Sequence, residues 1–246
     1  MNLRYIALGL DYDYYSKMNN ELRYEFQLHT RYISNYLSKE IRKHKFQTDG
    51  TFNMLSISLL PDKIKDTKIV ALDVLETYLL FDKSKYEKIK GSDKCDYYLE
   101  LFEEGFKKAN KFKSVPVDVL LSLLKEFKKG GCRNEWLHKK KNFKNHNLQI
   151  ILSCEFTTNY FQLIITINQI SSKKEIVREI IMKTEPDEIL FEKMFKDILI
   201  ENDEIIVTDS SDGPRVIINI EDLYSNQFKY QILGDKEIKE ILSYKL

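Results

Sequence analysis

The spacing of apolar residues changes partway along this chain, and that change limits the folds open to it. Before residue 130 apolar residues recur mostly at helical spacing, whereas after Asn147 they alternate or run together as in β-strands. The clearest helical stripe consists of Leu22, Phe26, Ile33, Leu37 and Ile41. We therefore expect an α+β protein, with a helix-rich N-terminal half and an antiparallel-sheet-rich C-terminal half.

The first half is expected to open with a strand over residues 3–15, with Tyr5, Ala7, Gly9, Asp11 and Asp13 on one face. A long helix, capped at Asn19 or Asn20, follows to about residue 45, and a strand over 52–62 stops at Pro61. Residues 66–82 fit strand and helix almost equally, with helix favoured after Asp73. Two amphipathic helices are predicted over 93–111 and from Ser114 or Pro116 to Gly130-Gly131.

In the second half, residues 148–169 predict two strands around a turn at residues 157–159, with a third strand over 174–183. A helix is expected from Thr184 to Leu199, because Pro186 and several acids stand at its start. Residues 204–209 and 214–220 predict a hairpin, and a strand and a helix end the chain. One domain over 1–246 is the first expectation; a division into 1–130 and 147–246 stays open.

Composition excludes some functions. Lysine and arginine total 39 against 38 acids, so no overall field draws the chain to nucleic acid or to an anionic membrane. The basic residues are mostly lysine, a bias typical of AT-rich genomes, which weakens the meaning of any lysine run. The N-terminal apolar segment has about six residues, too short to span a membrane. The three cysteines, odd in number and widely spaced, do not predict a disulfide framework, so we expect a reducing compartment, most simply the cytoplasm.

Residues 130–147, GGCRNEWLHKKKNFKNHN, gather basic, aromatic and metal-ligating side chains. Lysines with Trp136 and Phe143 would suit a nucleic-acid patch, but a solvated connector whose Trp136 packs back onto the domain is the favoured interpretation. A zinc site is disfavoured, because zinc ligands usually come in closely spaced pairs. The ligand set considered and set aside is Cys132, His138, His146 and Cys154.

No catalytic signature is found. Asp11 with Asp13 could hold a divalent cation, and residues 209–213 (DSSDG) present two acids, but each pattern is more often structural. His29 falls on the apolar stripe of the long helix, where a core histidine is expected. No phosphate-binding loop and no nucleophile motif is present, so we expect neither an enzyme, nor a cofactor, nor a bound metal.

Acidic residues crowd one segment of the second half. Between residues 185 and 204 there are eight acids and two lysines. An acidic surface is what a protein uses to capture a basic partner quickly. The expected partner-binding residues are Asp187, Glu188, Glu192, Asp197, Glu201, Asp203 and Glu204.

The runs 130–164 and 184–198 are similar in character to proteins encoded beside toxins in polymorphic-toxin and contact-dependent inhibition loci of low-GC bacteria. That resemblance implies an immunity protein, which neutralises a cognate toxin in the cytoplasm, and it transfers no individual site residue. The leading hypothesis is therefore a non-enzymatic cytoplasmic binding protein with a protein partner, such as a basic toxin domain. The alternatives are a metal-dependent enzyme or binder acting on nucleic acid, and a structural or regulatory dimer.

Overall fold

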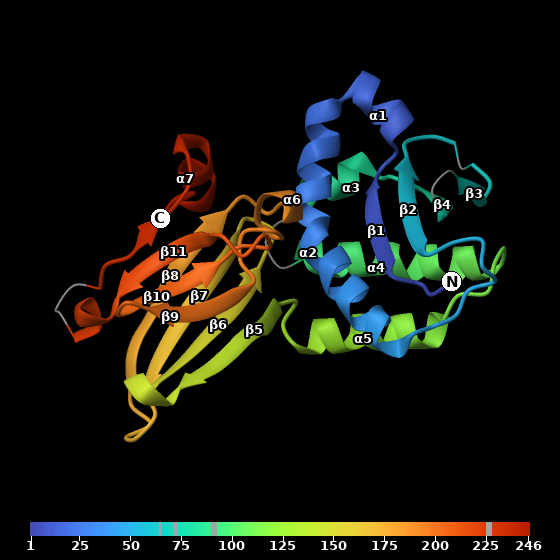
Figure 1. Ribbon diagram of the computed structural model, residues 1–246. Coiled ribbons are helices and arrows are strands. Elements are labelled where there is room, and N and C mark those ends of the chain that lie inside the picture. The colour runs from blue at the N-terminus through green and yellow to red at the C-terminus, as the bar shows by residue number, and fades with distance from the viewer. Residues whose placement is uncertain (64, 71–72, 90–92, 225–227) are drawn as a thin grey trace. The chain divides into compact units, whose positions relative to one another are not determined.

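The computed structural model describes residues 1–63, 65–70, 73–89, 93–224 and 228–246, and the chain forms two compact units (Figure 1). Unit 1 comprises Met1–Asn134 and unit 2 comprises Glu135–Leu246. The expected α+β class is confirmed: unit 1 combines helices with a mixed sheet, and unit 2 holds two antiparallel sheets. None of the helices in the described ranges has the length and apolar character needed to cross a membrane.

Unit 1 holds a four-stranded sheet in the order β1-β2-β4-β3, in which β1, β2 and β4 run parallel and β3 is antiparallel to β4. Its elements are β1 (Tyr5–Leu10), α1 (Tyr12–Met18), α2 (Asn20–His44), β2 (Met54–Leu60), β3 (Lys68–Val70), β4 (Val74–Leu80), α3 (Lys83–Lys88), α4 (Asp93–Asn110) and α5 (Val117–Lys129).

The predicted long helix is confirmed as α2, which Asn19 caps by accepting a hydrogen bond from the backbone N–H of Leu22 at 3.0 Å. It lies along the outer edge of β1. Ser38 Oγ accepts from the N–H of Ile6 at 2.9 Å, and Thr30 Oγ1 donates to the carbonyl of Leu8 at 2.9 Å. Two hydroxyls thus satisfy backbone groups that a further strand would otherwise pair.

The two predicted amphipathic helices are confirmed as α4 and α5. In α4 the predicted inward residues are all buried, namely Cys95, Tyr98, Phe102, Phe106 and Ala109. A Cβ added at Gly105 would clash with the side chain of Ile57, so the glycine lets α4 lie close against β2. Phe127 of α5 packs on Tyr36 of α2 with ring centroids 4.7 Å apart, which joins the two helices.

Unit 2 contains a meander in the order β5-β6-β7-β8 and a second antiparallel sheet in the order β12-β11-β10-β9. Its elements are β5 (Asn134–Phe143), η1 (Lys144–His146), β6 (Leu148–Phe156), β7 (Phe161–Gln169), β8 (Glu175–Thr184), α6 (Glu188–Phe191), β9 (Asp197–Glu201), β10 (Glu204–Thr208), β11 (Pro214–Asn219), η2 (Ile220–Tyr224), β12 (Gln231–Ile232) and α7 (Lys236–Leu242).

Alternate residues of β6 are buried, and Phe161 of β7 stacks on Phe191 of α6 with centroids 3.6 Å apart. The ring of Phe161 also lies parallel to that of Phe195, at 5.6 Å, and edge-on to that of Phe156. These contacts place an aromatic cluster at one end of the meander. The predicted meander strands after Asn147 and the hairpin of β10 with β11 are confirmed.

Four expectations about elements are wrong. The strand expected over 3–15 ends at Leu10, because Asp11 caps helix α1 over Tyr12–Met18. Residues 74–80 form strand β4 rather than a helix, because pairing with β2 buries Leu75, Thr77 and Leu79 on one face. The expected helix over 184–199 is only α6, and its last residues join β9, where Ile198 and Ile200 pair with β10. The expected solvated connector is largely β5, the first strand of the meander. For the sheet residues, pairing with another strand decides the structure: β4 pairs with β2, whereas β9 and β5 pair with the next strand along the chain.

Candidate functional site

The acids predicted to bind a partner do not form one helical face. Asp187 is only 7% exposed and caps α6, where its carboxylate accepts from the N–H of Ile189 at 3.0 Å. Asp197 lies on β9 against two lysines of β5, with Nζ of Lys141 at 2.8 Å and Nζ of Lys139 at 3.4 Å. These two carboxylates therefore already hold structure within unit 2.

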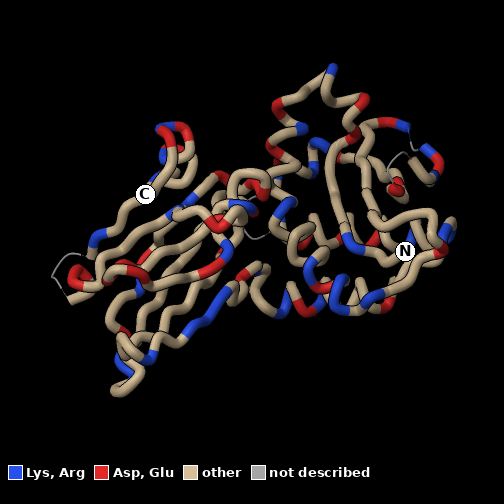
Figure 2. The backbone as a smooth tube through the Cα atoms, viewed as in Figure 1, with Lys and Arg blue, Asp and Glu red and all other residues tan. Residues whose placement is uncertain are grey.

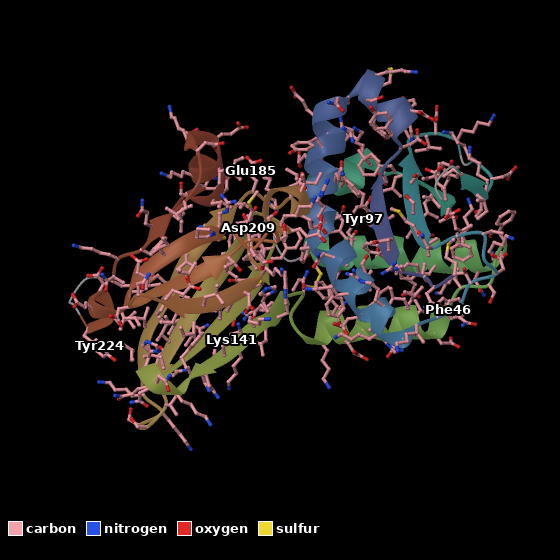
Figure 3. The ribbon with its side chains drawn as sticks, in the orientation of Figure 1. Phe46, Tyr97, Lys141, Glu185, Asp209 and Tyr224 are labelled. Carbon is pink, nitrogen blue, oxygen red and sulfur yellow. A yellow bond between two sulfur atoms is a disulfide. The ribbon has the colours of Figure 1, made fainter. Side chains whose placement is uncertain are left out.

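The environment of Asp197 favours its charged form. Partial burial would raise the pKa of the carboxyl, but the hydrogen bonds from Lys141 and from the N–H of Ile198, with the nearby lysine charges, lower it below its ordinary value. Lys141 also donates to the carbonyl of Ile198 at 3.0 Å (Figure 3). This lysine thus links the edge of β5 to the edge of β9.

Glu192 is exposed just after α6, and Glu188 is half-buried within it. The remaining predicted acids gather at the β9–β10 hairpin, where Glu201 and Asp203 are exposed and Glu204 is half-buried. Glu201 and Glu204 are directly opposite each other across the two strands, and Asn202 and Asp203, both with positive φ, form the turn between them. Like charges in directly opposed positions destabilise a sheet.

Two neighbours of this hairpin were not predicted as site residues. The N–H of Ile220 donates to the carbonyl of Asp203 at 2.9 Å, which holds η2 against the turn. Helix η2 adds Glu221, which is exposed, and Tyr224, whose side chain is 65% exposed (Figure 3). Figure 2 shows acidic segments at both the hairpin and η2. We call Glu201, Asp203, Glu204, Glu221 and Tyr224 the acidic hairpin surface.

Within the described ranges, no lysine, arginine or histidine forms an ion pair with any of the four carboxylates of the acidic hairpin surface. Elsewhere in the unit exposed acids do have partners, as Asp212 has with Lys196 at 2.8 Å. Like charges that face each other without a compensating cation destabilise the fold locally. Such locally unfavourable arrangements are expected at functional sites. This surface is the best candidate binding site of unit 2.

The part of the lysine-rich stretch that follows Asn134 is engaged in the fold of unit 2. Besides Lys139 and Lys141, His138 contacts the carbonyl of Lys196 through Nε2 at 3.1 Å and packs edge-on against Phe195. Burial lowers the pKa of His138 from its ordinary value, which keeps the ring neutral near pH 7. The expectation that Trp136 packs back is met within unit 2, since its ring lies 6.1 Å from that of Phe161.

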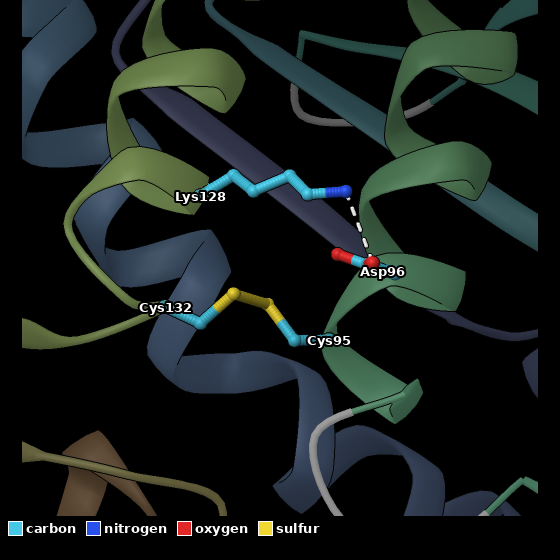
Figure 4. Close-up of a disulfide and its surroundings, with 4 residues drawn as sticks. All are labelled: Cys95, Asp96, Lys128 and Cys132. Carbon is cyan, nitrogen blue, oxygen red and sulfur yellow. Dashed lines mark ion pairs between the residues drawn. A yellow bond between two sulfur atoms is a disulfide. The ribbon is translucent and has the colours of Figure 1, made fainter.

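The cysteine expectation is wrong, because Cys95 and Cys132 form a disulfide (Figure 4). The bond joins the first turn of α4 to the residues just after α5, and an ion pair from Lys128 to Asp96 at 3.0 Å lies beside it. The two cysteines are 37 residues apart in sequence, and only the side-by-side packing of the two helices brings them together. Cys154 is a buried cysteine on β6 that forms no disulfide, as expected.

The considered zinc ligands are therefore dispersed: Cys132 is bonded to Cys95, and Cys154 is buried on β6. The other acidic candidate, Asp11, is not on a strand face with Asp13. It follows β1, caps α1 by accepting from the N–H of Tyr14 at 2.9 Å, and pairs with Lys65 at 3.0 Å. In the part of the chain that the structure describes, no three His, Cys, Asp or Glu side chains are grouped to hold a metal.

Asp209, in the predicted DSSDG turn, is a structural residue. It accepts from the N–H groups of Ser211 and Gly213 and pairs with Arg215 at 2.5 Å. Burial would raise the pKa of Asp209, but these bonds lower it. His29 is half-buried and contacts the hydroxyl of Tyr86 through Nδ1 at 3.1 Å, consistent with a histidine satisfied within unit 1.

Comparison of the chain with protein-family models, curated proteins and solved structures finds no significant match.

Proposed function

We propose that the protein is a non-enzymatic binding protein of the immunity type, which captures a basic protein partner, such as a toxin domain, on the acidic hairpin surface. The observation that carries this proposal is the group of four uncompensated carboxylates on the β9–β10 hairpin and on η2, the 3-10 helix that ends at the exposed Tyr224. Complementary charge raises the rate of association and fixes orientation, and an exposed tyrosine supplies contact area at low entropic cost. Both are features of a surface used for recognition.

Of the predicted partner-binding acids, Glu201, Asp203 and Glu204 are central to this proposal, and Glu221 and Tyr224 are added to them. Asp187 and Asp197 support the surface indirectly, since they hold α6 and β9 in place. Glu188 and Glu192 lie before β9 and belong to the same acidic segment. The cytoplasmic location stays in the proposal only as what the resemblance to immunity proteins implies, because the disulfide between Cys95 and Cys132 removes the cysteine argument for a reducing compartment.

The nucleic-acid alternative loses its main support. Two of the lysines that would contact phosphates are paired with Asp197, and Cys132 is bonded to Cys95. The dimer alternative keeps only the exposed tyrosines of the N-terminal segment, such as Tyr5 and Tyr12, which are 44% and 68% exposed. The acidic hairpin surface therefore carries the proposed function.

The test is affinity capture of the tagged full chain from its host, with mass spectrometry of what is recovered. We expect one stoichiometric, basic, toxin-like protein. The double variant Glu201→Lys/Asp203→Lys should then slow association with that protein by about tenfold or more at low salt. The matched control Glu175→Lys/Glu237→Lys changes two exposed acids of the same unit away from the hairpin and should keep the association rate within about twofold.

Recovery of nucleic acid, or of no specific protein, would contradict the proposed function. If a basic partner is found but both double variants slow association equally, the partner binds through the overall charge of unit 2, and the assignment to the hairpin fails. Tyr224→Ala separates contact from charge: it should raise the dissociation rate and leave the salt dependence of association unchanged.

A further inference from the structure

We propose that a groove along α4 of unit 1 binds a small aliphatic diamine, with one ammonium group over the ring of Tyr97 and the other at Glu104. The groove has a volume of about 480 Å³, which is within the range of small-molecule sites, and it lies beside the end of β4 and the start of α3. This inference is independent of the proposed partner, because it concerns unit 1 alone. The residues that carry it are Leu80, Asp82, Tyr97, Glu100, Leu101 and Glu104.

Carboxylates outnumber ammonium groups in this groove, which four acids and two lysines line. Both lysines already have partners among those acids. Lys85 pairs with Glu100 at 3.2 Å, and Lys107 pairs with Glu103 at 2.5 Å. The two acids without an ion pair in the described ranges are Asp82 and Glu104. The charge of the groove is therefore complementary to a ligand with two positive groups.

Tyr97 supplies an observation that is independent of charge. Its side chain is only 5% exposed, and its hydroxyl is buried without a hydrogen bond to any residue that the structure describes. Ring contacts with Tyr86 and Tyr98 hold the side chain in place. Nearly all buried hydroxyls in proteins are hydrogen-bonded, so this one, on a residue that lines a groove, points to a ligand atom that can bond to it.

The surroundings of this hydroxyl suit a cation. Burial and the nearby charges of Asp82 and Glu100 raise the pKa of Tyr97 to about 12, so the hydroxyl stays protonated and neutral at pH 7. Its oxygen and the two carboxylates can then accept the three hydrogen bonds that a primary ammonium group donates. Lys85 shows that such a group fits there, since its own Nζ lies 5.1 Å from the centre of the Tyr97 ring.

The ligand would displace this lysine. The side chain of Lys85 is 52% exposed, so its ammonium group can move into solvent at little cost when the ligand takes its place at Glu100. The exchange keeps one positive charge at Glu100, and the second ammonium group of the ligand compensates Glu104.

The spacing of the acids along α4 sets the length of the ligand. Glu100 and Glu104 are four residues apart on one face of the helix, which corresponds to a rise of about 6 Å. Two amino groups joined by four methylene groups are separated by a similar distance. Leu101, which is buried, and Leu80, which is exposed, line the same groove and offer apolar contact to the methylene chain. The arrangement fits putrescine.

The first test titrates the full chain with putrescine at low salt by isothermal calorimetry. We expect saturable binding of one molecule, and ethylenediamine should bind at least about fivefold more weakly, because its amino groups are too close to engage both carboxylates. Magnesium chloride supplies the same charge without a methylene chain. Equal affinity for the three cations would mean simple attraction to acids and would overturn the proposal, as would the absence of saturable binding at millimolar putrescine.

The second test changes the charges of the groove. Glu104→Gln should weaken putrescine binding by about fivefold or more, because one of the two carboxylates is removed. Glu126→Gln makes the same charge change at an exposed acid of α5 and should keep the affinity within about twofold. Lys85→Ala should strengthen binding by at least about twofold, since no lysine then competes with the ligand. Equal effects of the two glutamine variants, or weaker binding to Lys85→Ala, would contradict the assigned site.

Tyr97→Phe separates a ligand contact from a structural role. Because the hydroxyl has no partner in the described ranges, its removal should leave the urea midpoint unchanged or raise it, and should weaken putrescine binding by at least about threefold. A variant that binds putrescine as before would overturn the role of the hydroxyl. A lower urea midpoint would show that the hydroxyl bonds within the fold, which would also overturn it.

Discussion

The two units of this chain carry charge of opposite sign. Unit 1 has 24 lysines and arginines against 19 acids, whereas unit 2 has 15 against 19, so a formal charge of +1 hides a basic half and an acidic half. They also differ in cross-linking, since unit 1 contains the disulfide, whereas the cysteine of unit 2, Cys154, forms none. The difference shows that the net charge of the whole chain says little about its binding partners when the chain folds as two units.

The largest expected effect tests the cross-link. Reduction of the disulfide should lower the free energy of unfolding of unit 1 by about 2–4 kcal/mol, because the bond restricts a loop of 37 residues in the unfolded chain. Urea unfolding followed by tyrosine circular dichroism reports mainly unit 1, which has 11 of the 15 tyrosines. The fluorescence of Trp136 reports unit 2, and its urea midpoint should stay unchanged on reduction. A shift of both midpoints would contradict the conclusion that the disulfide stabilises unit 1 alone.

A smaller effect is expected at the anchor of residue 134. Asn134→Ala should destabilise unit 1 by about 1–3 kcal/mol, because the buried carbonyl of Tyr32 and the amino group of Lys39 lose a partner. Asn35→Ala is a milder comparison, since it removes one bond to the Asn134 amide and leaves the Tyr32 contact. Equal losses of stability in the two variants would mean that the bonds of Asn134 to Tyr32 and Lys39 do not account for the effect.

In unit 2 the pair of Asp209 with Arg215 should make stability depend on pH. The folded pKa of Asp209 lies below its unfolded value, so the contribution is fully present above about pH 4 and is lost as pH falls through the folded pKa. Asp209→Asn should remove this acid dependence and lower the free energy of unfolding at pH 7 by about 1–3 kcal/mol. Urea midpoints measured by Trp136 fluorescence between pH 2 and 7 would check both the acid dependence and the loss of stability at pH 7. If the variant lost stability at low pH as the original protein does, Asp209 would not be the source of the acid dependence.

The smallest effect on stability is expected at the acidic hairpin surface. Glu201→Gln removes one of two directly opposed like charges and should leave stability unchanged or raise it by a few tenths of a kcal/mol. Asp197→Asn is the contrasting variant: it breaks two lysine contacts and should cost up to about 1 kcal/mol. Thermal unfolding of both proteins would show whether uncompensated and compensated acids differ in this way.

Much of the fold could be predicted because its signals are local. The cap at Asn19, the apolar stripe of α2, the Gly-Gly end of α5 and the alternation of β6 each depend on a few neighbouring residues. The errors occur where pairing with another strand overrides the helical spacing of the apolar residues. Residues 74–80 are a strand because β2 lies beside them, and the end of the expected 184–199 helix is a strand because β10 does.

The candidate site shows the same limit. The sequence identified Glu201, Asp203 and Glu204 as part of an acidic run, but not that Asp197 would face Lys139 and Lys141 from 56 to 58 residues earlier. Glu221 and Tyr224 could not be assigned to the surface, because only the bond between Ile220 and Asp203 brings η2 to the hairpin. The disulfide was missed for the same reason, since helix packing and not spacing pairs Cys95 with Cys132.

The hydroxyls of Thr30 and Ser38 also restrict how this protein can assemble. Since they occupy the N–H and the carbonyl of Ile6 and the carbonyl of Leu8, helix α2 stands where a neighbouring molecule would have to add a strand to β1. At the opposite edge of the same sheet, β3 offers only three residues. Unit 1 is therefore closed to strand addition at the β1 edge and offers only a short edge at β3, which disfavours assembly by extension of this sheet.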